Sequence, residues 1–126
     1  MIKNKYKIHS IKELEELAKT ISSNLEKGDI IALIGEIGSG KTTLSKFLIN
    51  QLTSIEINQI NSPTFNLYQS YNKNNVLVNH YDFYRIEKYQ DLDEIDLEDS
   101  YKNGITIIEW ADKYINALTQ DYIEIH

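Results

Sequence analysis

Three observations predict a single α/β domain with a central, largely parallel sheet flanked by helices. Two apolar runs, "DIIALIG" at 29–35 and "ITIIEW" at 105–110, are typical of strands buried on both faces. Stretches with helical apolar spacing alternate with strand-like runs along the chain. The chain has 126 residues, which fits one hydrophobic core. We therefore expect one domain that spans residues 1–126.

Composition and charge exclude several classes of protein. The formal net charge is -6, and residues 91–99, "DLDEIDLED", carry six acids without a cation, so strong nucleic-acid binding by the chain alone is not expected. No apolar run approaches the roughly 18 residues of a membrane span. No apolar stretch follows the first lysines, so a secretory signal is not expected. The chain has no cysteine, which fits a reducing compartment. We expect a cytoplasmic protein without a membrane partner.

The first half of the chain has clear helix and strand signals. Residues 5–9 suggest a short strand, and Ser10 is typical of a helix N-cap, with Glu13 at the capping-box position. The helix that follows is expected to end by Gly28. Residues 29–35 then predict a buried strand, and a second helix is expected over 41–52. The apolar stripe of the first helix consists of Ile11, Leu14, Leu17, Ala18, Ile21 and Leu25.

The second half of the chain has weaker local signals. "PTFNLYQSY" at 63–71 and "VLVNHYD" at 76–82 favour strands, and "DLDEIDLEDSY" at 91–101 favours a short acidic helix. "ADKYINALT" at 111–119 suggests a helix, and "YIEIH" at 122–126 suggests a closing strand.

The stretch "GEIGSGKTT" at 35–43 matches the phosphate-binding pattern G-x-x-x-x-G-K-[ST], also called Walker A. Gly35, Gly38 and Gly40 let the backbone curl so that its amides point at a phosphate, and the next helix adds its positive end. Lys41 can then reach the terminal phosphates, and the Thr42 hydroxyl can bind Mg²⁺. The alternative is a glycine-rich turn without a ligand. The strand before it and the helix after it favour a nucleoside-triphosphate site in a P-loop NTPase-like fold. The residues assigned to the nucleotide are Ile37, Gly38, Ser39, Gly40, Lys41, Thr42 and Thr43.

Two carboxylates complete the predicted site. Asp82 ends the strand 76–82 and Glu109 ends the run "ITIIE", and ligands of open α/β sheets bind at the carboxyl ends of strands. A buried acid at a strand end is costly unless it faces a cleft, a cation or a partner. Either residue could instead be a solvated strand end.

Four further residues have both a functional and a structural interpretation. Arg85, the only arginine, could approach the phosphates or pin its loop by an ion pair. His80 could sense the nucleotide, although a buried histidine with a hydrogen-bond partner is the simpler interpretation. Thr64, in "SPTF", could bring a hydroxyl near the γ-phosphate or could simply begin a strand. Trp110 is more often a core residue than a functional one.

Four motifs occur in series: "GEIGSGKTT", "SPTF", "HYDFYR" and "IEWADKY". Together they resemble the bacterial TsaE (YjeE) family, and the resemblance covers nearly the whole chain. It implies a small ATPase, and therefore a hydrolase, that takes part in tRNA processing. Such an ATPase is required to make N6-threonylcarbamoyladenosine at position 37 of tRNAs. It also implies binding and slow hydrolysis of ATP to ADP with Mg²⁺, and association with the TsaB–TsaD pair that transfers threonylcarbamoyl.

The resemblance also implies roles for individual residues. Lys41 would grip the phosphates, and Thr42 and Glu109 would hold the magnesium. The catalytic set would be Asp82, Thr64 and Arg85, with Asp82 and Thr64 in two switch-like segments. Family members usually run on into a further strand with basic residues, so we expect the domain to lack that last strand and the sheet edge beside 122–126 to be open.

Three rival functions share the phosphate-binding loop. A small-molecule kinase usually gathers several arginines at the transferred phosphate, and this chain has one. A GTPase would carry the guanine-reading N-K-x-D pattern, whereas "NKNN" at 72–75 has no aspartate. An ATP-dependent assembly factor with incidental hydrolysis shares every motif, and the sequence does not separate it from the ATPase.

Overall fold

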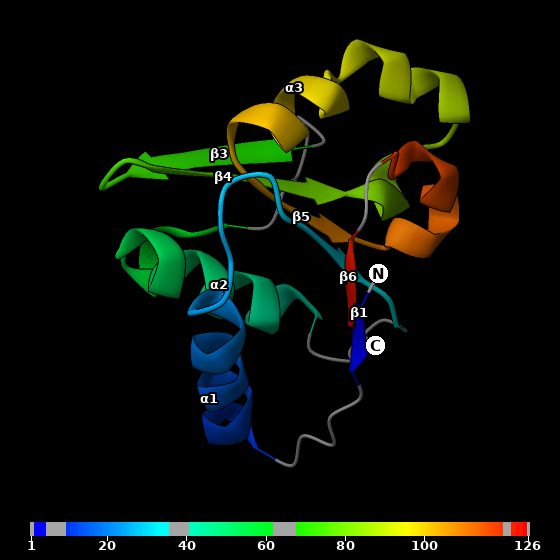
Figure 1. Ribbon diagram of the computed structural model, residues 1–126. Coiled ribbons are helices and arrows are strands. Elements are labelled where there is room, and N and C mark those ends of the chain that lie inside the picture. The colour runs from blue at the N-terminus through cyan, green and yellow to red at the C-terminus, as the bar shows by residue number, and fades with distance from the viewer. Residues whose placement is uncertain (1, 5–9, 36–40, 62–67, 120–121, 126) are drawn as a thin grey trace.

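The domain is built around one mixed sheet that separates two groups of helices (Figure 1). The computed structural model describes residues 2–4, 10–35, 41–61, 68–119 and 122–125, with the main chain alone at 2–4, 85, 93 and 94. The six strands lie in the order β1-β6-β2-β5-β4-β3. They are β1 (Ile2–Asn4), β2 (Ile30–Leu33), β3 (Tyr68–Lys73), β4 (Val76–Asp82), β5 (Ile105–Glu109) and β6 (Ile123–Ile125). All neighbouring strands pair in parallel except β3, which is antiparallel to β4. The predicted α/β fold with a largely parallel sheet is confirmed.

Helices cover both faces of this sheet. Helices α1 (Ile11–Ser22) and α2 (Lys41–Thr53) pack against each other on one face, and α3 (Leu97–Asn103) lies on the other (Figure 1). The remaining helices are short and of the 3-10 type. They are η1 (Ile57–Gln59), η2 (Phe83–Arg85), η3 (Tyr89–Glu94) and η4 (Ala111–Ala117). Among the helices of the described residues, none has both the length and the apolarity needed to cross a membrane.

The central strand β2 has no polar residue because both of its faces are buried. Successive side chains of a strand point to opposite faces. Ile31 and Leu33 join the core beneath α1 and α2, while Ile30 and Ala32 join the core on the α3 side. All four residues are buried. The continuous apolar run therefore reflects a strand covered on both faces, as predicted.

Helix α1 begins as predicted but ends earlier. Ser10 caps it, because the Ser10 hydroxyl accepts a hydrogen bond from the backbone N–H of Glu13. The helix ends at Ser22, and Leu25 packs against the core from the turn that follows. Ile11 does not belong to the buried stripe, because its side chain is 68% exposed.

The second half of the chain departs from the prediction at three places. The acidic stretch 91–101 forms two helices, because η3 ends at Glu94 with Ile95 as its C-cap and Asp96 caps α3 by accepting a hydrogen bond from Asp99 N–H. Residues 111–119 give the 3-10 helix η4, which is broken at Tyr114, rather than a regular helix. The expectation of an open sheet edge beside 122–126 is wrong, since β6 pairs with β1 on one side and β2 on the other.

The strand expected at 5–9 lies outside the described residues, as does the first part of the strand expected at 63–71.

A tight hairpin joins β3 and β4. Lys73 pairs with Val76, and the two residues between them, Asn74 and Asn75, have φ angles of 56° and 64°. Two consecutive left-handed residues are the backbone of a type I′ turn, in which asparagine is one of the few tolerated residues besides glycine. The polar stretch "YNKNN" therefore belongs to the hairpin itself, and the turn sets the register of β3 on β4.

Gly104 joins α3 to β5 at a point of close contact. A Cβ atom at this position would lie 2.6 Å from the carbonyl oxygen of Leu77 and 3.1 Å from its Cγ. The backbone of β4 therefore leaves no room for a larger residue here.

We expect Gly104→Ala to destabilise the domain by roughly 1–3 kcal/mol, because the added methyl group forces β4 and β5 apart. Urea denaturation followed by circular dichroism measures the loss. Lys102→Ala, at an exposed position of the same helix, is the control and should change stability by less than about 0.5 kcal/mol. Equal stability of Gly104→Ala and the native protein would contradict the close packing.

Candidate functional site

The carboxyl ends of β4 and β5 bring the two predicted acids together. Asp82 is the last residue of β4, Glu109 is the last residue of β5, and the two are direct partners in the parallel pairing. Val78 lies four positions before Asp82, and Ile105 and Ile107 lie four and two positions before Glu109. All three side chains belong to the core beneath α2. Because strand side chains alternate, Asp82 and Glu109 also point toward the α2 face.

Helix α2 begins beside these acids. Lys41, Thr42 and Thr43 form its first turn, directly after the phosphate-binding loop predicted from the sequence. The Thr42 hydroxyl donates a hydrogen bond to Oε1 of Glu109 at 2.8 Å. The start of α2 and the end of β5 are therefore joined through the two residues assigned to magnesium from the sequence.

Glu109 is a buried acid with partners for both carboxylate oxygens. Glu109 is only 2% exposed, and its Oε2 lies 2.5 Å from Nε2 of His80. Burial raises the pKa of the Glu109 carboxyl, but the hydrogen bond and electrostatic attraction of His80, the Thr42 hydrogen bond and the Lys41 charge outweigh it. The net pKa lies below its ordinary value. Glu109 is therefore an ionised carboxylate in a nearly dry position.

Within the described part of the chain, the Lys41 ammonium contacts a backbone carbonyl oxygen and an aromatic ring. Nζ donates a hydrogen bond to the carbonyl oxygen of Gly35 at 2.5 Å and lies 4.3 Å from the centroid of the Trp110 ring. An ammonium above an indole face is a favourable cation–π contact. Trp110 has a left-handed backbone, with φ 57° and ψ 37°, at the junction between β5 and η4. The expectation that Trp110 is a core residue is therefore incomplete, since its ring contacts the lysine of the site.

Asp82 has a structural task of its own. Its Oδ1 accepts a hydrogen bond from Tyr84 N–H at 3.0 Å, which caps η2, the short helix that Arg85 closes. Asp82 is half-buried, so it is neither a core residue nor a fully solvated strand end. The predictions for the side chain of Arg85, for Thr64 and for the loop residues Ile37, Gly38, Ser39 and Gly40 lie outside the described part of the chain.

An aromatic cluster next to the site was not predicted. The rings of Tyr84 and Trp110 lie 4.8 Å apart, and Nζ of Lys113 donates a hydrogen bond to the Tyr84 carbonyl oxygen. Tyr84 is more than half exposed. The only signal in the sequence is that "HYDFYR" and "IEWADKY" both follow strands, which does not specify the contact between them.

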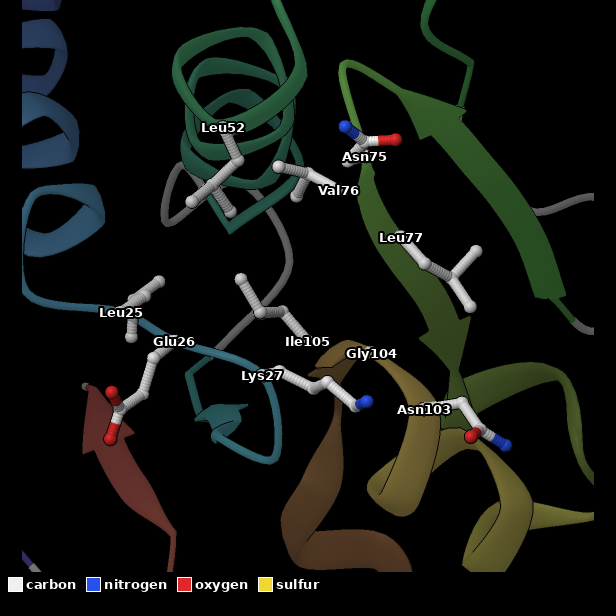
Figure 2. Close-up of a pocket in the computed structure, with 10 residues that line it drawn as sticks. All are labelled: Leu25, Glu26, Lys27, Leu52, Asn75, Val76, Leu77, Asn103, Gly104 and Ile105. Atoms are coloured by element: carbon white, nitrogen blue, oxygen red, sulfur yellow. The ribbon is translucent and has the colours of Figure 1, made fainter.

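A separate cavity lies at the opposite end of the strands, where β4 and β5 begin. Figure 2 shows it at the beginning of β4 and β5. The volume of the cavity is about 170 Å³. Its lining is apolar at Leu25, Leu52, Val76, Leu77 and Ile105 and polar at Glu26, Lys27, Asn75 and Asn103, and Gly104 completes it. Because parallel strands begin at this edge and end at the other, the cavity is not part of the site formed by Thr42 and Glu109.

The sheet, the helix start and the two strand-end acids define a P-loop-like α/β protein. The model of one protein family, described as "Threonylcarbamoyl adenosine biosynthesis protein TsaE", matches residues 8–126. The chain belongs to the TsaE family. The sequence resemblance to that family is thereby confirmed.

Individual relatives agree with this assignment. A protein of Rickettsia conorii named "tRNA threonylcarbamoyladenosine biosynthesis protein TsaE" is 34% identical over 119 residues, which cover 94% of this chain and 67% of that protein. The protein of the same name from Bacillus subtilis is 30% identical over 122 residues, 96% of this chain and 75% of that protein. The crystal structure of Bacillus subtilis YdiB superposes with a TM-score of 0.70 over 97% of this chain and 74% of that one, at 24% identity, and so supports the fold.

The contact between Lys41 and Trp110 gives a direct optical test, because Trp110 is the only tryptophan. An ammonium in contact with an indole can donate a proton to its excited state and quench it. We therefore expect Lys41→Met to raise the tryptophan fluorescence of the nucleotide-free protein. Lys46→Met, on the same helix, is the control and should leave the emission unchanged. Equal emission from Lys41→Met and the native protein would show that the contact is absent in solution.

Proposed function

We propose that this protein binds ATP with Mg²⁺ and hydrolyses it slowly, in support of tRNA threonylcarbamoyladenosine formation by partners of the TsaB–TsaD type. The proposal rests on membership of the TsaE family and on the names of relatives in that pathway. Because the modified substrate is a tRNA, we expect the protein to act in the cytoplasm. With a net charge of -6, it would reach that substrate through its partners rather than by binding RNA itself.

The observation that carries the proposal is the hydrogen bond between Thr42 and Glu109. It joins a helix start, where main-chain N–H groups favour an anion, to an ionised carboxylate at a strand end. An ionised acid with less than a tenth of its surface exposed is costly unless a cation or hydrogen-bond donors compensate it. A divalent ion beside a triphosphate would use that charge.

The donor set fits magnesium. Mg²⁺ prefers oxygen ligands and is usually held by one or two carboxylates together with phosphates and water. Thr42 and Glu109 would supply a hydroxyl and a carboxylate oxygen. Among the described residues no group of three or more histidines and acids is placed to hold a metal, so the other ligands would come from the nucleotide and from water. When bound, the ion would neutralise charge on the β- and γ-phosphates.

The remaining residues would position the nucleotide. Lys41 would exchange the Gly35 carbonyl for phosphate oxygens, since the ammonium prefers an anion to a neutral acceptor. Asp82 would orient the attacking water, and its cap on η2 would link that position to the segment carrying Arg85. With one arginine in the chain, no second one can act as an internal finger, so turnover without partners should be slow.

Glu109→Gln tests the metal assignment. The amide keeps an oxygen to accept the Thr42 hydrogen bond but lacks the charge, so the gain in ATP affinity from Mg²⁺ should fall about tenfold or more. Calorimetric titration with ATP, in Mg²⁺ and in EDTA, measures that gain. Glu16→Gln, at an exposed position of α1, is the control. An unchanged gain in Glu109→Gln would refute metal binding at Glu109.

Asp82→Asn separates binding from hydrolysis. Asparagine retains the oxygen that caps η2, so the fold and ATP affinity should persist, while hydrolysis should fall about a hundredfold if the carboxylate orients the water. Phosphate release, measured with the partner pair present, gives the rate. Parallel loss of affinity and rate would make Asp82 a structural residue.

The same variant separates the ATPase from an assembly factor with incidental hydrolysis. If Asp82→Asn binds ATP, fails to hydrolyse it and still supports repeated threonylcarbamoyl transfer, then hydrolysis is not the functional event. If transfer stops after the first turnover, hydrolysis is needed to reset the complex.

A further inference from the structure

His80 is the second partner of the Glu109 carboxylate. Its side chain is completely buried, and its Nε2 lies 2.5 Å from Oε2 of Glu109. The other carboxylate oxygen, Oε1, accepts the hydrogen bond from Thr42. Each oxygen of Glu109 thus has its own donor, and the three side chains form a chain from the start of α2 to the middle of β4.

The pairing of β4 and β5 creates this contact. Asp82 is the direct partner of Glu109, and His80 pairs with Ile107. His80 and Asp82 are two residues apart and therefore point to the same face of the sheet as Glu109. His80 is the diagonal neighbour of Glu109, and an imidazole is long enough to span that separation. A shift of one residue in this register would turn His80 to the opposite face.

The second ring nitrogen of His80, Nδ1, faces away from Glu109 and shows that Nε2 makes the important polar contact of the ring. Nδ1 of His80 is buried and has no hydrogen-bond partner among the described residues. The polar interactions of the ring with that part of the chain are therefore concentrated at Nε2. A proton must lie between Nε2 and the ionised carboxylate, because both atoms would otherwise be acceptors.

We propose that His80 is a positioning residue that fixes the Glu109 carboxylate in the orientation in which Oε1 faces Thr42. Glutamate has three side-chain torsions, and without a donor at Oε2 the carboxylate would turn to find another partner. The importance of this orientation for magnesium rests on the proposed function. The chemistry is that of a donor that aims a metal-binding carboxylate without touching the ion.

Two amide variants test the position of the donor. In His80→Gln the side-chain amide nitrogen can reach the place of Nε2, whereas in His80→Asn it reaches only the place of Nδ1. Both variants are neutral and polar, so charge and hydrogen-bonding type are matched. We expect the gain in ATP affinity from Mg²⁺ to stay within about twofold of the native value in His80→Gln. In His80→Asn the same gain should be about tenfold smaller. Affinity for ATP in EDTA should be similar in both.

The outcomes separate the inference from the proposed function. If Glu109→Gln loses the Mg²⁺ gain but the two His80 variants behave alike, the positioning role is wrong and the metal assignment stands. If Glu109→Gln keeps the gain, the metal assignment fails. Thermal unfolding of both variants controls for stability, and a loss of affinity in EDTA that matches the loss in Mg²⁺ would indicate a merely structural histidine.

A measurement without nucleotide or metal tests the contact itself. In the ¹⁵N-labelled protein the Nε2 proton of His80, assigned by its disappearance in His80→Gln, should resonate far downfield because it bonds to a carboxylate. Glu109→Gln replaces that acceptor by a neutral amide and should move the resonance upfield. An unchanged resonance in Glu109→Gln would overturn the inference whatever the metal experiments show.

Discussion

The parallel pairing of β2, β5 and β4 is the constraint on which the site depends. Parallel strands end at the same edge of a sheet, so the end of β5 lies between the start of α2, which follows β2, and the end of β4. Glu109 can then receive a donor from each side, Thr42 from the helix and His80 from the neighbouring strand. The carboxylate stays ionised in a buried position because these neighbours compensate its desolvation.

The sequence predicted the elements whose signals are local. The strands at 30–33 and 105–109 are nearly all apolar, and α2 follows directly from the phosphate-loop pattern, so neither depends on distant residues. The element at 111–119 was predicted as a helix. Its geometry is decided by the left-handed Trp110 before it and by the break at Tyr114. Packing against the sheet overrides local propensity there.

Within the site, sequence reasoning found which residues lie at the strand ends but not how they are joined. The proximity of Thr42 and Glu109 follows from the order of strand, loop and helix, whereas their role as metal ligands stays a prediction. The contact between His80 and Glu109 depends on the register of β4 against β5, and no short-range pattern specifies a register between strands so far apart in sequence. The contact of Lys41 with Trp110 was missed because it joins the start of α2 to the junction after β5, and no local pattern specifies that contact.

The place of β6 between β1 and β2 has a consequence for how the chain folds. Among the described strands β1 borders β6 alone, so β1 has no neighbour in this sheet until β6 has left the ribosome. The strands β2 to β5 with α2 and α3 can assemble earlier, since their pairings need nothing from either end. The pairing of β1 with β6 therefore forms late and closes the longest loop among the described strand pairings, and such non-local closure is slow.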